Sequence, residues 1–154
     1  MRAAAAATGY AARDGLEGLR LEVTERVALQ ADDAVVGDLR RLSDLGVRLA
    51  LDDFGTGYAS LLHVRRLPID ELKIDGSFVN GLGVDPDDTA IVRAVTALAG
   101  SLGLDTVAEG VERAEQLPLL RELGCRHAQG YLLGRPMEEA ELTRRLDAAA
   151  SARA

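Results

Sequence analysis

The fold of this chain is indicated most directly by residues 47–57, whose sequence is VRLALDDFGTG. A short apolar strand over 47–51 runs straight into two adjacent carboxylates, Asp52 and Asp53. Neighbouring side chains of a regular strand face opposite sides, so both carboxylates can reach one site only where the strand ends and the chain turns. The following Phe-Gly-Thr-Gly run over 54–57 is predicted to supply that turn.

Working outward from this stretch, a strand is repeatedly followed by a helix. Alternating or continuous apolar runs predict strands, which cover 19–25, 47–51, 71–74, 106–108 and 128–131. Apolar positions at helical spacing predict helices, which cover 33–45, 86–102, 119–123 and 137–149. Asp33 and Asp85 are the predicted N-caps, and Pro118 is expected at the start of its helix. Successive strand-helix units imply right-handed crossovers and a parallel sheet.

The ends of the predicted strands carry polar residues at a regular interval. These residues are Glu22, Asp52, Lys73, Glu109 and Gln129, spaced by 30, 21, 36 and 20 positions. Both a doubly wound sheet and a barrel show such a period. An eight-unit barrel typically needs about 250 residues, and 154 residues accommodate only about five units. The predicted fold class is α/β, a partial TIM-type β/α barrel with about five of eight units and its N-terminal strands missing.

Composition narrows the classes of function. With 47% apolar and 28% charged residues, the chain has enough apolar mass for one globular domain, and no apolar run approaches the length of a membrane span. The net charge of −7 disfavours nucleic acid as a partner. The single Cys125 excludes an internal disulfide and is typical of a cytoplasmic protein. Of the 18 basic residues, only Lys73 is a lysine.

Four carboxylates are expected on one rim of the sheet, namely Glu22, Asp52, Asp53 and Glu109. Converging carboxylates repel one another unless they are protonated or neutralised by cations. Ligands that are all oxygen atoms suit hard divalent ions such as Mg²⁺ or Mn²⁺, and no cluster of Cys and His points to zinc. The sequence therefore predicts a metal site at this rim.

Six motifs in order carry a family resemblance. They are EVTE at 22–25, DDFGTGYAS at 52–60, LP at 67–68, LKID at 72–75, AEGVE at 108–112 and QGY at 129–131. From about residue 15 to 146 the chain resembles the second half of an EAL domain, the bacterial phosphodiesterase that opens cyclic di-GMP to linear pGpG. The DDFGTGY and AEGVE blocks are the most specific of these motifs.

The resemblance implies a TIM-type barrel with a two-metal site that uses Mg²⁺ or Mn²⁺. Carried over by motif, Glu22 and Asp52 are metal ligands, and Asp53 holds the second metal. Glu109 binds metal or water and is the candidate general base. Two metal ions suit the reaction because they neutralise a phosphodiester and activate a water molecule.

The resemblance also assigns roles around the metals. Lys73 orients or activates the attacking water, and Gln129 positions water or phosphate and contacts the substrate. Glu25 anchors the loop over 54–60, and Glu112 is a further substrate contact.

One part of the family pattern is absent from this sequence. The name-giving Glu-Ala-Leu segment and an Asn-bearing strand precede the Glu22 motif in a whole EAL domain, and nothing over 1–20 resembles them. We expect residues 1–14 to be an Ala-rich tail or linker remnant, and residues 15–150 to be the C-terminal portion of an EAL domain. The isolated chain is expected to hydrolyse cyclic di-GMP weakly or not at all.

Alternatives stand beside this prediction. The chain could be a non-catalytic remnant that binds cyclic di-GMP or a protein partner. The apolar stripe of the helix over 86–102 packs on its own sheet, the favoured interpretation, or forms a homodimer contact together with the loop after Asp53. An upstream sensory or diguanylate cyclase domain is a further expected partner.

Overall fold

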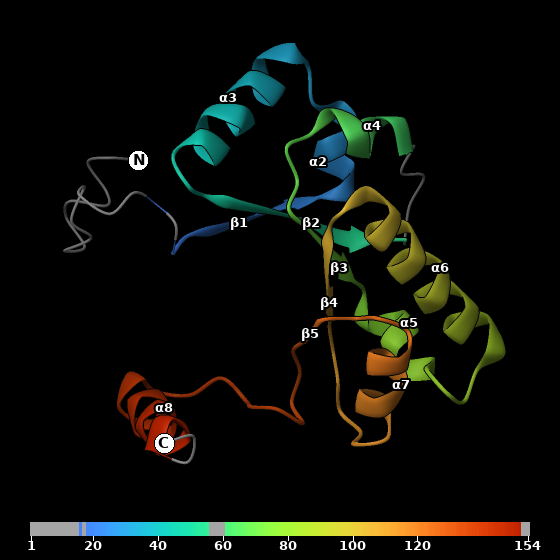
Figure 1. Cartoon of the computed structure of the whole chain (residues 1–154), viewed down its shortest axis with the longest axis vertical. Coiled ribbons are helices and arrows are strands. Elements are labelled where there is room, and N and C mark those ends of the chain that lie inside the picture. Colours follow the sequence, from blue (N-terminus) through green and yellow to red (C-terminus); the bar gives the residue numbers. More distant parts are fainter. Residues whose placement is uncertain (1–15, 17, 56–60, 152–154) are drawn as a thin grey trace.

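The strands of this protein form one parallel sheet. The computed structural model describes residues 16, 18–55 and 61–151, so the expected tail over 1–14 and most of the loop over 54–60 lie outside the described residues. The strands are β1 (Arg20–Thr24), β2 (Arg48–Phe54), β3 (Glu71–Ile74), β4 (Asp105–Ala108) and β5 (His127–Ala128), in that order across the sheet (Figure 1). A doubly wound sheet would reverse its strand order partway. The sequential strand order therefore confirms the predicted partial β/α barrel.

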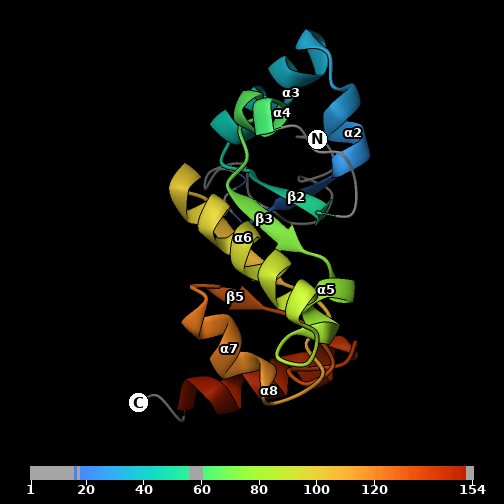
Figure 2. The same cartoon turned by 90° about the vertical axis from the view of Figure 1, so that its right-hand side faces the viewer.

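Helices follow the strands and enclose the apolar core. They are α2 (Glu25–Gln30), α3 (Asp33–Asp44), α4 (Leu61–Arg66), α5 (Gly76–Gly81), α6 (Pro86–Leu102), α7 (Gln116–Glu122) and α8 (Glu139–Ser151). Leu51, Leu72 and Ile74 of the central strands are fully buried in this core. In Figure 2 the long helix α6 crosses in front of the sheet. The alternate residues of the strands face away from the core and carry the charges of the site.

The apolar stripe of helix α6 packs against the sheet of the same chain. Val92 and Ala99 are 0% exposed, and the helix contacts β3 and β4 of its own sheet. Asp85 caps the helix by accepting hydrogen bonds from the backbone N–H groups of Asp87 (2.8 Å) and Asp88 (3.2 Å), as predicted. The stripe is thus used within the chain, which agrees with the favoured interpretation.

The ends of several elements differ from the prediction. Strand β1 stops at Thr24 because Glu25 already begins α2, although apolar and polar residues continue to alternate there. The N-cap of α3 is Asp32, whose carboxylate accepts the N–H of Val35 at 2.9 Å, and the predicted cap Asp33 is the first helical residue. Two adjacent aspartates offer the same cap chemistry, so the sequence did not distinguish them.

Strand β5 and helix α7 also begin at other residues than predicted. Strand β5 contains only two residues, so Gln129 follows the strand instead of lying within it. Helix α7 begins at Gln116, which places Pro118 in its first turn, where a missing N–H costs nothing. The short helices α2, α4 and α5 have six residues each, too few to show a helical period in the sequence.

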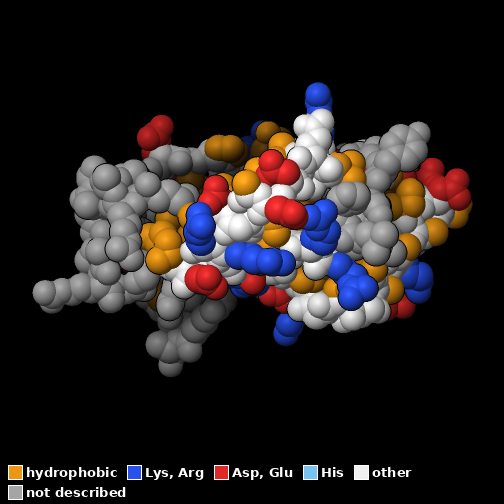
Figure 3. All heavy atoms as spheres, turned by 90° about the horizontal axis from the view of Figure 1, so that it is seen from above, with side chains coloured by type: hydrophobic (Ala, Val, Ile, Leu, Met, Phe, Trp, Pro, Cys, Tyr) orange, Lys and Arg blue, Asp and Glu red, His pale blue; other side chains and the backbone are white. Residues whose placement is uncertain are grey.

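The surface carries mixed charge and one unpacked helix. Figure 3 looks down on the end of the molecule that carries α3, where basic and acidic side chains intermingle, and ion pairs join Arg41 to Asp38 and Arg66 to Asp33. Helix α8 has no buried residue and stands apart from the sheet in Figure 1. Within the described part of the chain, no helix is long and apolar enough to cross a membrane.

Candidate active site

Lys73 lies at the centre of the rim formed by the carboxyl ends of the strands. It is 4% exposed, and its Nζ contacts three carboxylates that lie in β1, in β2 and directly after β4. The partners are Glu22 Oε2 at 2.9 Å, Asp52 Oδ1 at 2.8 Å and Glu109 Oε1 at 2.7 Å. Parallel strands bring their carboxyl ends to one edge, so residues far apart in sequence converge here. The structure brings these four predicted site residues together.

The carboxylates determine the charge state of this lysine. Burial by itself lowers the pKa of Lys73, but hydrogen bonds to Asp52, Glu109 and Glu22 outweigh burial and raise the pKa above its ordinary value. Lys73 therefore stays protonated at neutral pH. One ammonium against three carboxylates leaves the rim with net negative charge, which favours an additional cation.

The end of β2 is bent so that both aspartates face the rim. Asp53 has φ = 58°, a left-handed conformation, and the pairing of β2 with β3 shifts register between Leu51 and Phe54. The N–H of Asp53 donates to Asp52 Oδ1 at 3.1 Å. The chain therefore begins to bend at Asp53, one residue before the turn predicted over 54–57; Gly55 lies in a turn, and residues 56 and 57 lie outside the described residues. Aspartate adopts the left-handed region more readily than most residues.

Three carboxylates at this bend form a set of oxygen ligands. Asp52, Asp53 and Glu109 each offer an oxygen, and these atoms all lie within 4.8 Å of one another. An all-oxygen, negatively charged set fits a hard divalent ion such as Mg²⁺ or Mn²⁺. Glu22, the fourth predicted ligand, lies on the far side of Asp52 in the sheet and reaches the cluster through Lys73 Nζ.

Gln129 is held against this cluster by backbone and side-chain contacts. Its Nε2 donates to Glu109 Oε1 at 2.5 Å, and its N–H donates to the Ala108 carbonyl at 2.8 Å. The next residue, Gly130, has φ = 156°, and a Cβ there would come within 2.2 Å of the Val111 nitrogen. Only glycine allows the segment after β4 and the segment after β5 to approach this closely, which fixes the position of Gln129.

Glu25 occupies the place expected of a loop anchor. Its carboxylate is 5% exposed, and its Oε2 accepts the N–H of Gly55 at 3.3 Å. Gly55 has φ = 101° and packs near Phe78, so this turn depends on glycine. The contact ties the first residue of α2 to the residue that follows β2.

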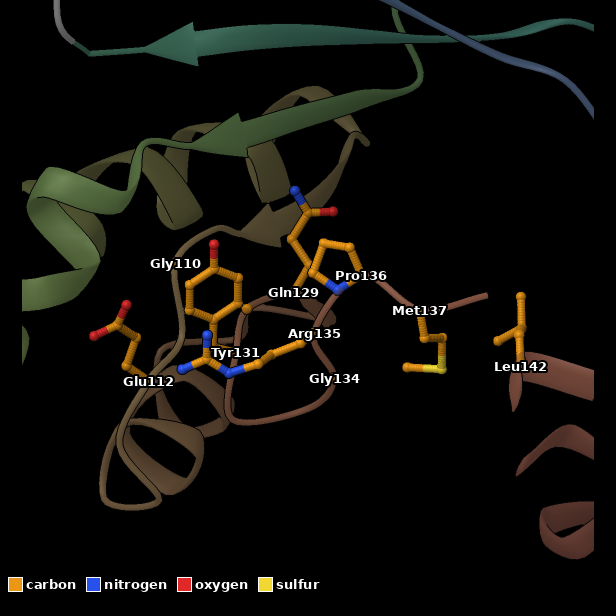
Figure 4. Close-up of a pocket in the computed structure, with 10 residues that line it drawn as sticks. Gly110, Glu112, Gln129, Tyr131, Gly134, Arg135, Pro136, Met137 and Leu142 are labelled. Carbon is orange, nitrogen blue, oxygen red and sulfur yellow. The ribbon is translucent and has the colours of Figure 1, made fainter. Parts of the chain in front are cut away.

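Glu112 lies in a separate part of the site. It is exposed, and it lines an open pocket of about 710 Å³ together with Gln129, Tyr131 and Arg135. Figure 4 shows Tyr131 beside Arg135, whose guanidinium carbon is 4.4 Å from the ring centroid, with Glu112 to one side. Glu112 is thus not brought to the carboxylate cluster, and Gln129 is the residue common to both.

Sequence reasoning missed one residue that shapes this region. Gln116 is fully buried, and its Oε1 accepts the N–H groups of Glu112 at 3.0 Å and Arg113 at 2.8 Å. Its Nε2 donates to the Val79 carbonyl at 2.7 Å. The available signal was a glutamine four positions before Leu120, on the buried side of its helix.

Comparison with known proteins identifies the family. The sequence profile of the EAL domain matches residues 7–136. The chain is 53% identical over 124 residues to the bifunctional diguanylate cyclase/cyclic di-GMP phosphodiesterase MucR of Pseudomonas aeruginosa, covering 80% of this chain and 18% of MucR. The chain therefore belongs to the EAL domain family, and it spans less than a fifth of this relative's length.

Solved structures agree with the fold. The PaMucR phosphodiesterase in complex with c-di-GMP superposes with a TM-score of 0.83 at 48% identity, covering 92% of this chain and 56% of that chain. The BlrP1 complex of Klebsiella pneumoniae with manganese and cyclic di-GMP gives a TM-score of 0.69 at 37% identity, covering 76% of this chain and 30% of that chain. The five-stranded sheet is thus part of an EAL-type barrel.

Proposed function

We propose that this chain carries much of a two-metal site that hydrolyses cyclic di-GMP to linear pGpG. The observation that carries the proposal is the rim cluster, in which Lys73 contacts Glu22, Asp52 and Glu109 beside Asp53. Family membership supports the substrate, because the relative MucR bears the name of a cyclic di-GMP phosphodiesterase.

The four carboxylates of the rim would hold the metal ions. Glu22, Asp52, Asp53 and Glu109 provide oxygen ligands, and Mg²⁺ or Mn²⁺ suits such ligands. When bound, a pair of divalent ions neutralises the charge of the phosphodiester and lowers the pKa of a water molecule. The carboxylates supply the negative charge that such ions require.

The neighbouring side chains are placed to assist hydrolysis. A water oxygen forms the new bond to phosphorus, one bridging phosphodiester bond breaks, and the freed 3′ oxygen takes up a proton. Glu109 can accept the proton of the water, and the hydrogen bond from Gln129 Nε2 fixes the orientation of that carboxylate. Lys73 adds a compact positive charge, a role that the wider guanidinium of arginine fills less well.

The second candidate function is binding of cyclic di-GMP or a protein partner without hydrolysis. The observation in its favour is coverage, since the chain spans 56% of the PaMucR phosphodiesterase chain and the edge strand β1 pairs only with β2 among the described strands. We also propose that this chain works together with an upstream sensory or diguanylate cyclase domain, that it forms a homodimer, and that it is located in the cytoplasm. These proposals hold for either candidate function.

A hydrolysis assay in Mg²⁺ or Mn²⁺, paired with isothermal titration of cyclic di-GMP, tests both functions. We expect metal-dependent binding by this chain with weak or no production of pGpG. The variant Asp52→Asn should lose binding, and Asp38→Asn, an exposed carboxylate on α3, should retain it. Robust turnover would overturn the expected weak activity, and binding that is indifferent to both metal and Asp52 would overturn the proposed site.

A further inference from the structure

Ala50 lies between the charged residues of the rim. Strand β2 places Arg48, Ala50 and Asp52 on its charged face, since alternate residues share a face. Ala50 is 1% exposed, and it is the register partner of Glu22 on β1 and of Glu71 on β3. The smallest side chain of this face therefore separates two carboxylates.

Two ion pairs pass over β2 at this position. Arg20 of β1 contacts Glu71 of β3 at 3.2 Å, and Glu22 of β1 contacts Lys73 of β3 at 2.9 Å. Neighbouring strands are about 4.8 Å apart, so β1 and β3 are separated by about twice that distance. Side chains must therefore lean across β2 to meet, and the methyl group of Ala50 leaves the space in which they do so.

A longer side chain at position 50 would occupy that space, because side chains of a strand stand roughly perpendicular to the sheet. Glu71 is 1% exposed and would then lose Arg20, its ion-pair partner, inside the protein. Glu22 is half-exposed on the edge strand, so it would turn outward into water at little cost. The carboxylate would thereby be lost from the rim while its residue remained unchanged.

We infer that Ala50 is a positioning residue, whose small size allows Glu22 to reach Lys73 and keeps β1 connected to the site. The consequence for metal affinity rests on the proposed function, in which Glu22 is a metal ligand. The consequence for the ion pair between Glu22 and Lys73 is independent of that function.

The single lysine of the chain allows a direct test in solution. A sample labelled with ¹⁵N in lysine gives one side-chain nitrogen signal, that of Lys73 Nζ. In the unaltered protein, Glu22→Gln should shift this signal because it removes the negative charge of one of the three partners of Lys73. In the Ala50→Leu background, the same Glu22→Gln substitution should produce no further shift, because the contact is already broken.

Matched variants distinguish size from other effects. Ala50→Ser should behave like the unaltered protein, and Ala50→Val should fall between serine and leucine, which also decides the question if Ala50→Leu does not fold. An undiminished response to Glu22→Gln in the valine and leucine backgrounds would overturn the inference.

A titration with Mn²⁺ tests the consequence for the metal site. We expect Ala50→Leu or Ala50→Val to weaken Mn²⁺ binding by about tenfold or more, within the range that supporting residues of a metal site contribute, and Ala50→Ser to leave it unchanged. Equal Mn²⁺ affinity in all of these variants would overturn this part of the inference. Failure of the unaltered chain to bind Mn²⁺ would instead contradict the proposed function, and the lysine signal would still decide the role of Ala50.

Discussion

At the scale of single residues, Lys73 neutralises part of the negative charge of the rim. It is nearly buried, whereas Asp52 and Glu109 are 20% and 18% exposed, so the ammonium neutralises carboxylates that water reaches poorly. An uncompensated charge in such a place is costly. The lysine thus has a structural role in addition to the proposed chemical one.

Replacing Lys73 with methionine should expose that structural role. We expect Lys73→Met to lower the free energy of unfolding in metal-free buffer by about 2 kcal/mol or more, because the carboxylates are left to repel one another. Mn²⁺ should restore part of the loss, so its stabilising effect should be larger in Lys73→Met than in the unaltered chain. Urea denaturation with and without Mn²⁺ measures both effects. Equal stability of the two proteins in metal-free buffer would contradict this account.

The ion pairs of Asp105 should make the free energy of unfolding depend on pH. Its hydrogen bond to Arg48 (2.9 Å), together with the ion pair to Arg126 (3.1 Å), outweighs burial and lowers the pKa of Asp105 below its ordinary value. A lowered pKa in the folded state stabilises the fold above the unfolded pKa, and this contribution disappears as the pH falls through the folded pKa.

Asp105→Asn should therefore reduce the unfolding free energy by about 1 kcal/mol at pH 7, and the difference from the unaltered chain should shrink as acid protonates Asp105. Urea denaturation at pH 7 and pH 3 checks this. Asp38→Asn is the control, since its carboxylate is 71% exposed and pairs only with Arg41 of the same helix among the described contacts. An Asp105→Asn deficit that persists undiminished at pH 3 would exclude this charge effect.

At the scale of elements, the bend at the end of β2 brings two carboxylates to one side. A left-handed conformation costs an ordinary residue about 1–2 kcal/mol, and β-branched residues tolerate it least. Asp53 therefore has a conformational role that can be separated from its charge.

We expect Asp53→Val to be less stable than Asp53→Asn by about 1 kcal/mol or more, because asparagine accepts φ = 58° and valine does not. Both variants should bind Mn²⁺ more weakly than the unaltered chain, since both lack the carboxylate. Equal stability of the two variants would show that the backbone relaxes out of the left-handed region.

The elements also show what sequence could and could not predict. Glu22, Asp52, Lys73 and Glu109 were found because each lies in or directly after a parallel strand, toward the same edge of the sheet, and this topology is readable from the alternation of strands and helices. The bend at Asp53, one residue before the predicted turn, was not predicted because a single left-handed residue leaves no trace in an apolar pattern. Contacts that cross a strand were beyond prediction, since they depend on the register between three strands.

The start of α2 shows a second limit. Glu25 continues the alternation of β1, so the pattern predicted a strand through it, whereas the chain turns into a helix that buries its carboxylate beside Gly55. Tertiary hydrogen bonding decided that boundary. The family resemblance nevertheless predicts that Glu25 anchors the loop over 54–60. A motif can indicate that two segments are in contact even where the apolar pattern gives the wrong secondary structure.

At the scale of the whole molecule, the sheet is a wall of five strands in sequential order. Its charged face and the outer edge of β1 correspond to surfaces that further β/α units would cover in a barrel. Among the described strands none pairs with the outer edge of β1, and an unpaired strand edge invites pairing with another chain.

A chimaera tests whether the rim needs those further units. We expect the part of the PaMucR phosphodiesterase that this chain does not cover, fused ahead of this chain, to form a domain that hydrolyses cyclic di-GMP faster than this chain alone. Asp52→Asn in the chimaera should abolish the gain. A folded, metal-bound chimaera without activity would show that the rim of this chain is not competent for hydrolysis.

Helix α8 has 13 residues, none of them buried, and we expect it to unfold locally before the rest of the protein does. A helix of this length is only marginally stable in water when nothing packs against it. Its amide hydrogens should exchange with deuterium almost as fast as those of a free peptide, whereas those of α6 should remain protected. A protease should therefore cut first between residues 131 and 138 and release the last helix, while the sheet and its rim stay intact.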